Sequence, residues 1–142
     1  MSEKMNDIAQ SEEWKVWHEA KVKGNYPKWP NEPMLKSIFG CYSTQEKKPQ
    51  PDWRVLDVGC GFGNNLIPFA DIGCECHGVE IHEDICSLSE EVLAGKGIKA
   101  KIKVGSNRNL PYPDDHFDLV LSVATIHYEG IEENVLAAHW QW

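Results

Sequence analysis

The sequence lacks long hydrophobic runs: no stretch of its 142 residues approaches the roughly 18 uninterrupted apolar residues that a membrane span needs. Its start, MSEKMNDIAQSEEW, has neither the apolar core of a signal peptide nor the arginine-rich pattern of a transit peptide. These absences predict a cytoplasmic protein that does not bind membranes. With 42% hydrophobic and 25% charged residues, the composition is that of one globular domain with a single core.

Positive charge is scarce, because 14 Lys and Arg residues stand against 22 Asp and Glu residues and leave a formal net charge of −8. Nucleic-acid binding needs clustered Lys and Arg, so this balance argues against a nucleic-acid partner. The one local cluster is Lys96, Lys99, Lys101 and Lys103. Its last three members alternate with apolar residues, which indicates a half-buried strand at a sheet edge.

Cysteine occurs without the spacing of a disulfide framework. The odd count of five is typical of a reducing compartment. The group Cys74–His77 with His82 and Cys86 is a conceivable zinc site, but no second CxxC or HxxxH completes four ligands. We therefore expect no metal, and we expect the cysteines to pack as small apolar side chains.

The first 50 residues differ in composition from the rest, since they are rich in Trp and Pro. They hold an amphipathic stretch, Ile8–Val22, and a shorter predicted helix, Pro33–Phe39. We interpret residues 1–50 as a helical arm and residues 51–142 as the main part of what is effectively one domain. Five residues of the first helix are predicted to share an apolar side: Ile8, Trp14, Val16, Trp17 and Ala20.

From Trp53 onward, predicted strands alternate with predicted helices. The strands are expected at Arg54–Val58, Glu75–Val79, Ala100–Val104 and Phe117–Val123. The helices are expected at Asn64–Ala70, Glu83–Ala94 and Ile131–Ala138. This alternation predicts an α/β fold with a parallel sheet and a ligand site outside the carboxyl ends of the strands.

The segment with the clearest chemical signal is Val55–Asn64, which reads VLDVGCGFGN and places three alternate glycines between a predicted strand and a predicted helix. Glycine lets a ligand approach the backbone, and a helix start offers unpaired N–H groups to an anion. Glu80 follows the second predicted strand directly, where a carboxylate can accept hydrogen bonds from both ribose hydroxyls of an adenosine.

The glycines and Asp57 follow the pattern D-x-G-x-G-x-G, whereas the nicotinamide dinucleotide fingerprint is G-x-G-x-x-G. The segment resembles motif I of class I, Rossmann-like methyltransferases that depend on S-adenosylmethionine (SAM). Val104–Val120 also resembles the family's stretch from its third to its fourth strand. The resemblance spans residues 53–128 and implies a parallel sheet in the order 3-2-1-4. It implies SAM as cofactor, S-adenosylhomocysteine (SAH) as product and a small-molecule acceptor.

The resemblance also implies roles for single residues. Asp57 would face the methionine amino group of SAM, Glu80 would hold the ribose and Ile81 would pack against adenine. Ser106 stands where the family usually has an Asp, so Ser106 or Asn107 would bond the adenine ring instead. The other implied cofactor contacts are Gly59, Cys60, Gly61, Gly63, Asn64 and Ser122.

His127 follows the fourth predicted strand and is the candidate general base, because a neutral imidazole accepts a proton near pH 7. The alternative is that it only shapes the pocket. A base is optional, since the sulfonium is already a good leaving group. The aromatic residues of the arm have two interpretations, a lid over SAM or core packing: Trp14, Trp17, Tyr26 and Trp29.

Class I methyltransferases usually continue through three further strands, whereas this sequence ends soon after the fourth. We expect a truncated fold in which Phe117–Val123, although apolar like a fully buried strand, forms an edge. We therefore predict a homo-oligomer that pairs through this fourth-strand edge or exchanges its C-terminal segment. Two functions stay open, a SAM-dependent methyltransferase and a SAM- or SAH-binding or assembly module with little catalysis. A nicotinamide oxidoreductase is a distant third.

Overall fold

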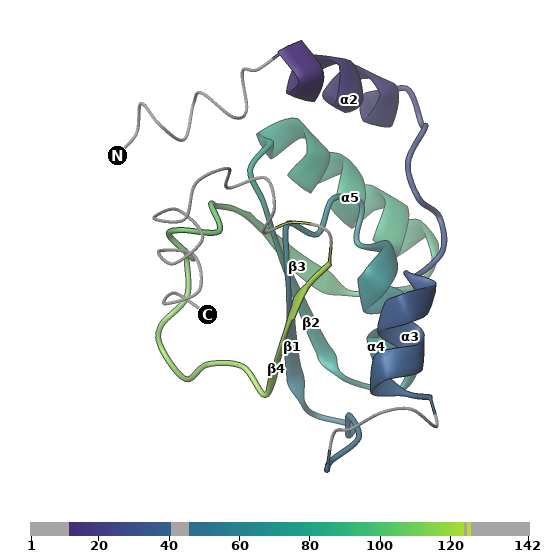
Figure 1. Ribbon diagram of the computed structural model, residues 1–142, viewed down its shortest axis with the longest axis vertical. Helices are drawn as coiled ribbons and strands as arrows, with labels where there is room; N and C mark the ends of the chain where they lie inside the picture. Colours follow the sequence, from purple (N-terminus) through teal and green to yellow (C-terminus); the bar gives the residue numbers. More distant parts are fainter. Residues whose placement is uncertain (1–11, 41–45, 124, 126–142) are drawn as a thin grey trace.

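A four-stranded parallel sheet forms the centre of the computed structural model, which describes residues 12–40, 46–123 and 125 (Figure 1). The strand order is β3-β2-β1-β4, which confirms the predicted Rossmann-like order. The strands begin and end close to the predicted positions, except that the fourth is shorter: β1 Arg54–Val58, β2 Glu75–Glu80, β3 Ala100–Val104 and β4 Leu119–Ser122.

The described helices are α2 Glu12–Val22, α3 Glu32–Ile38, α4 Ile67–Asp71 and α5 Glu83–Gly95. The single helix predicted over Asn64–Ala70 is instead a 3₁₀ turn, Asn64–Leu66, followed by α4. Proline explains the break, because Pro68 has no N–H to donate and stands in the first turn of α4. The helix predicted at Ile131–Ala138 lies outside the described residues, as does His127.

One face of the sheet carries the main core, because α3, α4 and α5 pack on it (Figure 1). Inward side chains of the strands, such as Val55 and Ile102, meet Leu66, Phe69 and Leu93 from the helices. The last three are at most 1% exposed. Each such side chain contributes roughly 1.5–3 kcal/mol through burial, which fixes the helices and the turns that lead into them.

In the part of the chain that the structure describes, the loop between β3 and β4 packs on the opposite face. Leu110, Tyr112 and Phe117 of this loop pack on a small buried cluster of Leu56, Val58 and Val79. A polar residue is buried with them: His77 bonds the Tyr112 hydroxyl at 3.1 Å and the Glu75 carboxylate at 2.7 Å. Burial lowers the pKa of His77, while the bond to Glu75 acts in the opposite direction.

The edges of the described sheet differ from each other. At β3, Lys101 and Lys103 are exposed and Ile102 is buried, as the predicted alternation of an edge strand requires, but Val104 is 50% exposed and departs from it. At β4, which pairs with β1 alone among the described strands, Leu121 is buried and the other residues are half-buried. The fourth strand is therefore an edge of the described sheet, as expected, and its residues are less buried than their apolar pattern alone suggests, because its outer side has no strand neighbour in the described part of the sheet.

The four described cysteines are free and buried, which confirms that they pack as small apolar residues: Cys60, Cys74, Cys76 and Cys86. Burial raises the pKa of Cys76 to about 12. The described residues contain no group of three or more His, Cys, Asp or Glu that could hold a metal ion. None of the described helices has the length and apolarity to cross a membrane.

The arm helix α2 lies beyond the carboxyl ends of the strands (Figure 1). The predicted apolar side is wrong at Val16, which is 69% exposed. The helix instead turns Trp17, His18 and Lys21 toward the rest of the molecule. Successive residues of a helix are rotated by about 100°, whereas residues four apart share a side. Trp17 and Lys21 therefore lie on one side of α2, and Val16 lies well away from it.

Candidate cofactor-binding site

The glycine turn after β1 bends through backbone angles that favour glycine. The φ angles of Gly59, Gly61 and Gly63 are 69°, 52° and 74°, all in the left-handed region. A Cβ atom at Gly59 would collide with Thr125, and one at Gly63 would lie 2.6 Å from Leu93 of α5. A Cβ at Gly61 would meet no atom within 4 Å, so Gly61 presents open backbone to the cavity.

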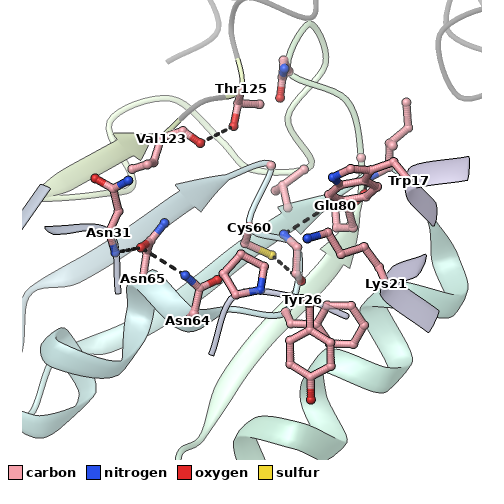
Figure 2. Close-up of a pocket in the computed structure, with 18 of the residues that line it drawn as sticks. Trp17, Lys21, Tyr26, Asn31, Cys60, Asn64, Asn65, Glu80, Val123 and Thr125 are labelled. Atoms are coloured by element: carbon pink, nitrogen blue, oxygen red, sulfur yellow. Dashed lines mark hydrogen bonds between the residues drawn. The ribbon is translucent and has the colours of Figure 1, made fainter. Parts of the chain in front are cut away.

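A cavity of about 320 Å³ lies at this end of the sheet, within the range of small-molecule sites (Figure 2). One side, which we term the arm wall, consists of Trp17, Lys21, Tyr26, Pro27, Trp29 and Asn31. The other side, termed the sheet wall, consists of the glycine turn, the ends of β2, β3 and β4, and the adjoining loops: Gly59, Cys60, Gly61, Phe62, Asn64, Asn65, Val79, Glu80, Ile81, Gly105, Ser106, Asn107, Arg108, Val123 and Thr125.

Most residues predicted to contact a cofactor come together in the sheet wall: Gly59, Cys60, Gly61, Asn64, Glu80, Ile81, Ser106 and Asn107. Three others lie behind the wall. Asp57 is buried in β1, Gly63 packs on α5, and the Ser122 hydroxyl is buried with no hydrogen-bond partner among the described residues. Of the aromatic residues in the arm, Trp17, Tyr26 and Trp29 line the cavity.

Glu80 connects the end of β2 to the glycine turn. Its Oε2 accepts the Gly61 N–H at 3.1 Å, and its Oε1 accepts the N–H groups of Ile81 and His82 at 2.9 and 3.2 Å. The His82 ring nitrogen Nδ1 lies 3.0 Å from the same Oε1. These contacts offset the cost of burying the carboxylate, and they fix its position at the cavity.

Asp57 is the second buried acid of the site, and it differs from Glu80 in lacking donors. It is 1% exposed, and its Oδ2 has no hydrogen-bond partner among the described residues. Burial, and then the neighbouring Glu80 charge, raise the pKa of Asp57 to about 8. A buried acid without a partner is the group that a cationic ligand atom would satisfy.

Polar side chains join the arm wall to the sheet wall. Asn65 Oδ1 accepts the Asn31 N–H at 2.7 Å, and Asn64 Nδ2 donates to the Trp29 carbonyl at 2.8 Å. Asn31 also caps α3, since its Oδ1 accepts the Met34 N–H at 3.0 Å. Sequence reasoning missed both the Asn31 and the Asn65 contacts, although Asn before Glu32 and Pro33 is a recognisable helix-start signal.

Two ring contacts complete the connection. The Tyr26 and Phe62 rings stack with their centroids 3.9 Å apart, which places an aromatic face of the arm on the glycine turn. Within α2, the His18 side chain pairs with the Asp84 carboxylate at 2.8 Å, and the centre of its ring lies 4.7 Å from that of His82. The arm is therefore held at both ends of the cavity, near the glycine turn and near the start of α5.

The residues of the cavity fit an adenosine carrying an amino-acid group. In the cavity lining, Glu80 supplies a fixed carboxylate and Gly61 supplies open backbone, while Asp57, buried behind the lining, supplies an unpartnered acid for an ammonium group. Val79, Ile81 and Val123 supply an apolar surface for a base or a hydrocarbon. This combination of few polar groups with apolar lining is typical of cofactor sites.

Comparison with known proteins identifies a family and several relatives. A family model described as a methyltransferase domain matches residues 55–141. Ajmaline N-methyltransferase from Rauvolfia serpentina is 36% identical over 86 residues, which cover 58% of this chain and 28% of that protein. Norajmaline N-methyltransferase from the same plant is 32% identical over 98 residues, 67% of this chain and 32% of that protein. The chain thus spans about a third of the length of these relatives.

Solved structures share the fold. The YcgJ protein from Bacillus subtilis has a TM-score of 0.61 at 23% identity and covers 75% of this chain and 42% of its own. A SAM-dependent methyltransferase from Aquifex aeolicus has a TM-score of 0.61 at 18% identity and covers 84% and 64%. At these identities the likeness establishes the architecture, and the site must be argued from the residues above.

Proposed function

The chain belongs to the methyltransferase domain family, and from this premise we propose that it binds SAM in the cavity and transfers the methyl group to an acceptor. The family match confirms the resemblance to SAM-dependent methyltransferases that the sequence showed. One observation supports the cofactor site most directly: the buried Glu80 carboxylate and the open backbone of Gly61 line one cavity at the strand ends, and the unpartnered Asp57 is buried behind its wall.

Each of these residues has a role in holding the cofactor. Glu80 would accept hydrogen bonds from the ribose hydroxyls, and Asp57 would accept a hydrogen bond from the amino group, directly or through water. Ile81 would pack on adenine, while Ser106 and Asn107 would bond its edge. The remaining sheet-wall contacts keep the backbone of the glycine turn close to the ligand: Gly59, Cys60, Gly61 and Asn64.

The bound cofactor would supply a methyl group on a sulfonium, so the chain's own task is to orient the reactants and exclude water. The arm wall serves this task, because Trp17, Tyr26 and Trp29 enclose one side of the cavity. The general base remains a prediction for His127, which lies outside the described residues. Thr125, two positions before it, is held by its hydroxyl, which lies within hydrogen-bond distance of the Val58 and Val123 carbonyls.

We propose a small organic molecule as the acceptor. The net charge of −8 does not favour nucleic acid, and two relatives are named for methylating ajmaline and norajmaline. A cytoplasmic location is part of this proposal, to be tested by cell fractionation.

The first experiment is calorimetric titration of the full chain with SAM and SAH, and with NAD as the competing cofactor class. Binding of SAH that Glu80→Ala abolishes would support the site, with Glu91→Ala as the matched control because Glu91 is exposed and does not line the cavity. No binding of SAH to the folded chain would contradict the proposal, as would tighter binding of NAD.

A second function is kept for the same site, a SAM- or SAH-binding or assembly module without turnover. It is favoured by β4, whose outer side has no strand neighbour in the described sheet and could pair with a second copy. Formation of SAH from SAM with a panel of small acceptors separates the two functions. Light scattering tests the pairing, since a monomer at micromolar concentration would contradict it.

A further inference from the structure

Lys21 is a charged residue of the cavity to which the matches with known proteins give no role. It stands in the last turn of α2, ahead of the residues that the family model covers. Figure 2 shows its side chain directed from the arm wall into the cavity, toward the side where Cys60 and Glu80 lie. A residue outside the family match therefore reaches the centre of the proposed site.

The ammonium group of Lys21 lacks an acidic partner in the described part of the chain. Its Nζ lies 4.9 Å from the centre of the Trp17 ring, and no described carboxylate lies within 4.0 Å. Partial burial lowers the pKa of Lys21, because burial disfavours the charged form. A cation held at a cavity under these conditions gains most from an anion that enters with a ligand.

We propose that Lys21 binds the carboxylate of the amino-acid part of the cofactor. This rests on the proposed function, because it assumes that SAM or SAH occupies the cavity. The ligand brings one anionic group, and the cationic side chains among the described lining residues are Lys21 and Arg108. Arg108 follows β3 beside Ser106, whose hydroxyl accepts the Arg108 N–H at 3.1 Å, on the side predicted for adenine. Lys21 faces the glycine turn, where the amino-acid part is predicted.

The inference gives the arm a role in recognition as well as in closure. Glu80 in the sheet wall would meet the ribose, Asp57 behind that wall would meet the amino group, and Lys21 in the arm wall would meet the carboxylate. The affinity of ligands that share the adenosine but lack the amino-acid group should then not depend on Lys21. The nucleoside 5′-methylthioadenosine is such a ligand, because it keeps the adenosine and the sulfur and has neither amino group nor carboxylate.

The test is calorimetric titration of the full chain and of Lys21→Met with SAH and with 5′-methylthioadenosine. We expect Lys21→Met to weaken SAH binding at least tenfold, as for loss of a charged hydrogen bond, and to change methylthioadenosine binding less than twofold. Lys21→Arg should retain SAH affinity within about threefold, since it keeps the charge. Lys23→Met is the matched control, because Lys23 is exposed at the end of the same helix and does not line the cavity.

Two results would contradict the role of Lys21. Equal losses for both ligands would overturn the inference, because Lys21 would then only shape the wall. Unchanged SAH affinity in Lys21→Met would overturn it as well, and an acceptor carboxylate would become the remaining partner. If the parent chain bound neither ligand, the proposed function itself would fail, and this inference with it.

Discussion

The two walls of the cavity are built on different physical principles. The sheet wall continues from strands and turns that the main core holds in place, with Val55, Leu66 and Phe69 at most 1% exposed. The arm is joined to the rest of the molecule by the Tyr26–Phe62 ring stack, by two hydrogen bonds that involve the Asn64 and Asn65 side chains, and by the His18–Asp84 pair. Its Trp29 side chain is 82% exposed.

This difference separates positioning from closure. A wall supported by nonpolar burial keeps its geometry whether or not a ligand is bound, because disturbing it disturbs the core. A wall attached by a few polar and aromatic contacts can open at small cost, as segments of low local stability do. Substitutions in the sheet wall should therefore change stability first, and substitutions in the arm wall should change binding first.

The strongest way to break the comparison is to remove core support from the sheet wall. Phe69→Ala in α4 leaves a cavity beneath the turn, since Phe69 is fully buried and its ring lies 5.2 Å from that of Phe39. We expect a loss of about 3–5 kcal/mol in the free energy of unfolding, measured by urea denaturation. A loss below about 1 kcal/mol would mean that this core does not hold the wall.

A second prediction concerns the charge state of the sheet wall. The pKa of Asp57 is raised from its ordinary value of 3.8 to about 8 in the folded chain. Between these values the folded chain holds a proton that the unfolded chain has lost, so stability falls as the pH rises from about 4 to about 8 and then levels off. For one proton the slope is at most about 1.4 kcal/mol per pH unit.

Urea unfolding of the parent chain and of Asp57→Asn between pH 5 and pH 9 measures this component. The difference between the two free energies should change with pH below about 8 and stay constant above it, because the amide does not titrate. Parallel curves over the whole range would show that Asp57 is ionised in the folded chain.

The third prediction addresses the junction of the walls. Tyr26→Ala removes the stack on Phe62, which is worth about 0.5–1.5 kcal/mol for an aromatic pair. We expect SAH affinity to fall about three- to tenfold, with no more than about 1.5 kcal/mol lost in stability. Tyr26→Phe is the matched control and should bind like the parent, since it keeps the ring. A stability loss as large as that of Phe69→Ala would erase the distinction between the walls.

The smallest effect is expected at the far attachment of the arm. The His18 and Asp84 side chains are 25% and 53% exposed, and such pairs contribute about 0.2–1 kcal/mol. A double-mutant cycle with His18→Asn and Asp84→Asn should give a coupling free energy in this range. A coupling well above 1 kcal/mol would mean that α2 is fixed to the body of the protein and does not act as a separate wall.

The fold was predictable because its signals are local. Strands β1 and β3 begin and end at the predicted residues, since alternating or continuous apolar residues and flanking glycines mark them. The strand order came from the family resemblance, because nothing in a single strand specifies its neighbour. The 3₁₀ turn before α4 and the exposure of Val16 were missed, since both depend on how the segment meets the rest of the chain.

The site was predictable mainly on the side of the sheet wall, because for the arm the sequence left a lid and core packing as alternatives for its aromatic residues. The glycine turn and Glu80 form a sequence pattern, and the structure places both at the cavity. Contacts of the arm wall join residues far apart in sequence, such as Asn31 and Asn65. No periodicity relates such residues, so Lys21 and the asparagines were recognisable as site residues only in three dimensions.

The buried cysteines allow local opening of the folded chain to be measured by thiol labelling. Thiolates react with alkylating reagents, and burial both raises the thiol pKa and blocks access, so each cysteine is labelled only when its surroundings open. Cys60 lies in the glycine turn, Cys76 near the start of β2 and Cys86 in the first turn of α5. The labelling rates of these three thiols therefore form a built-in kinetic map, in which motion at the ligand cavity is read separately from unfolding of the sheet.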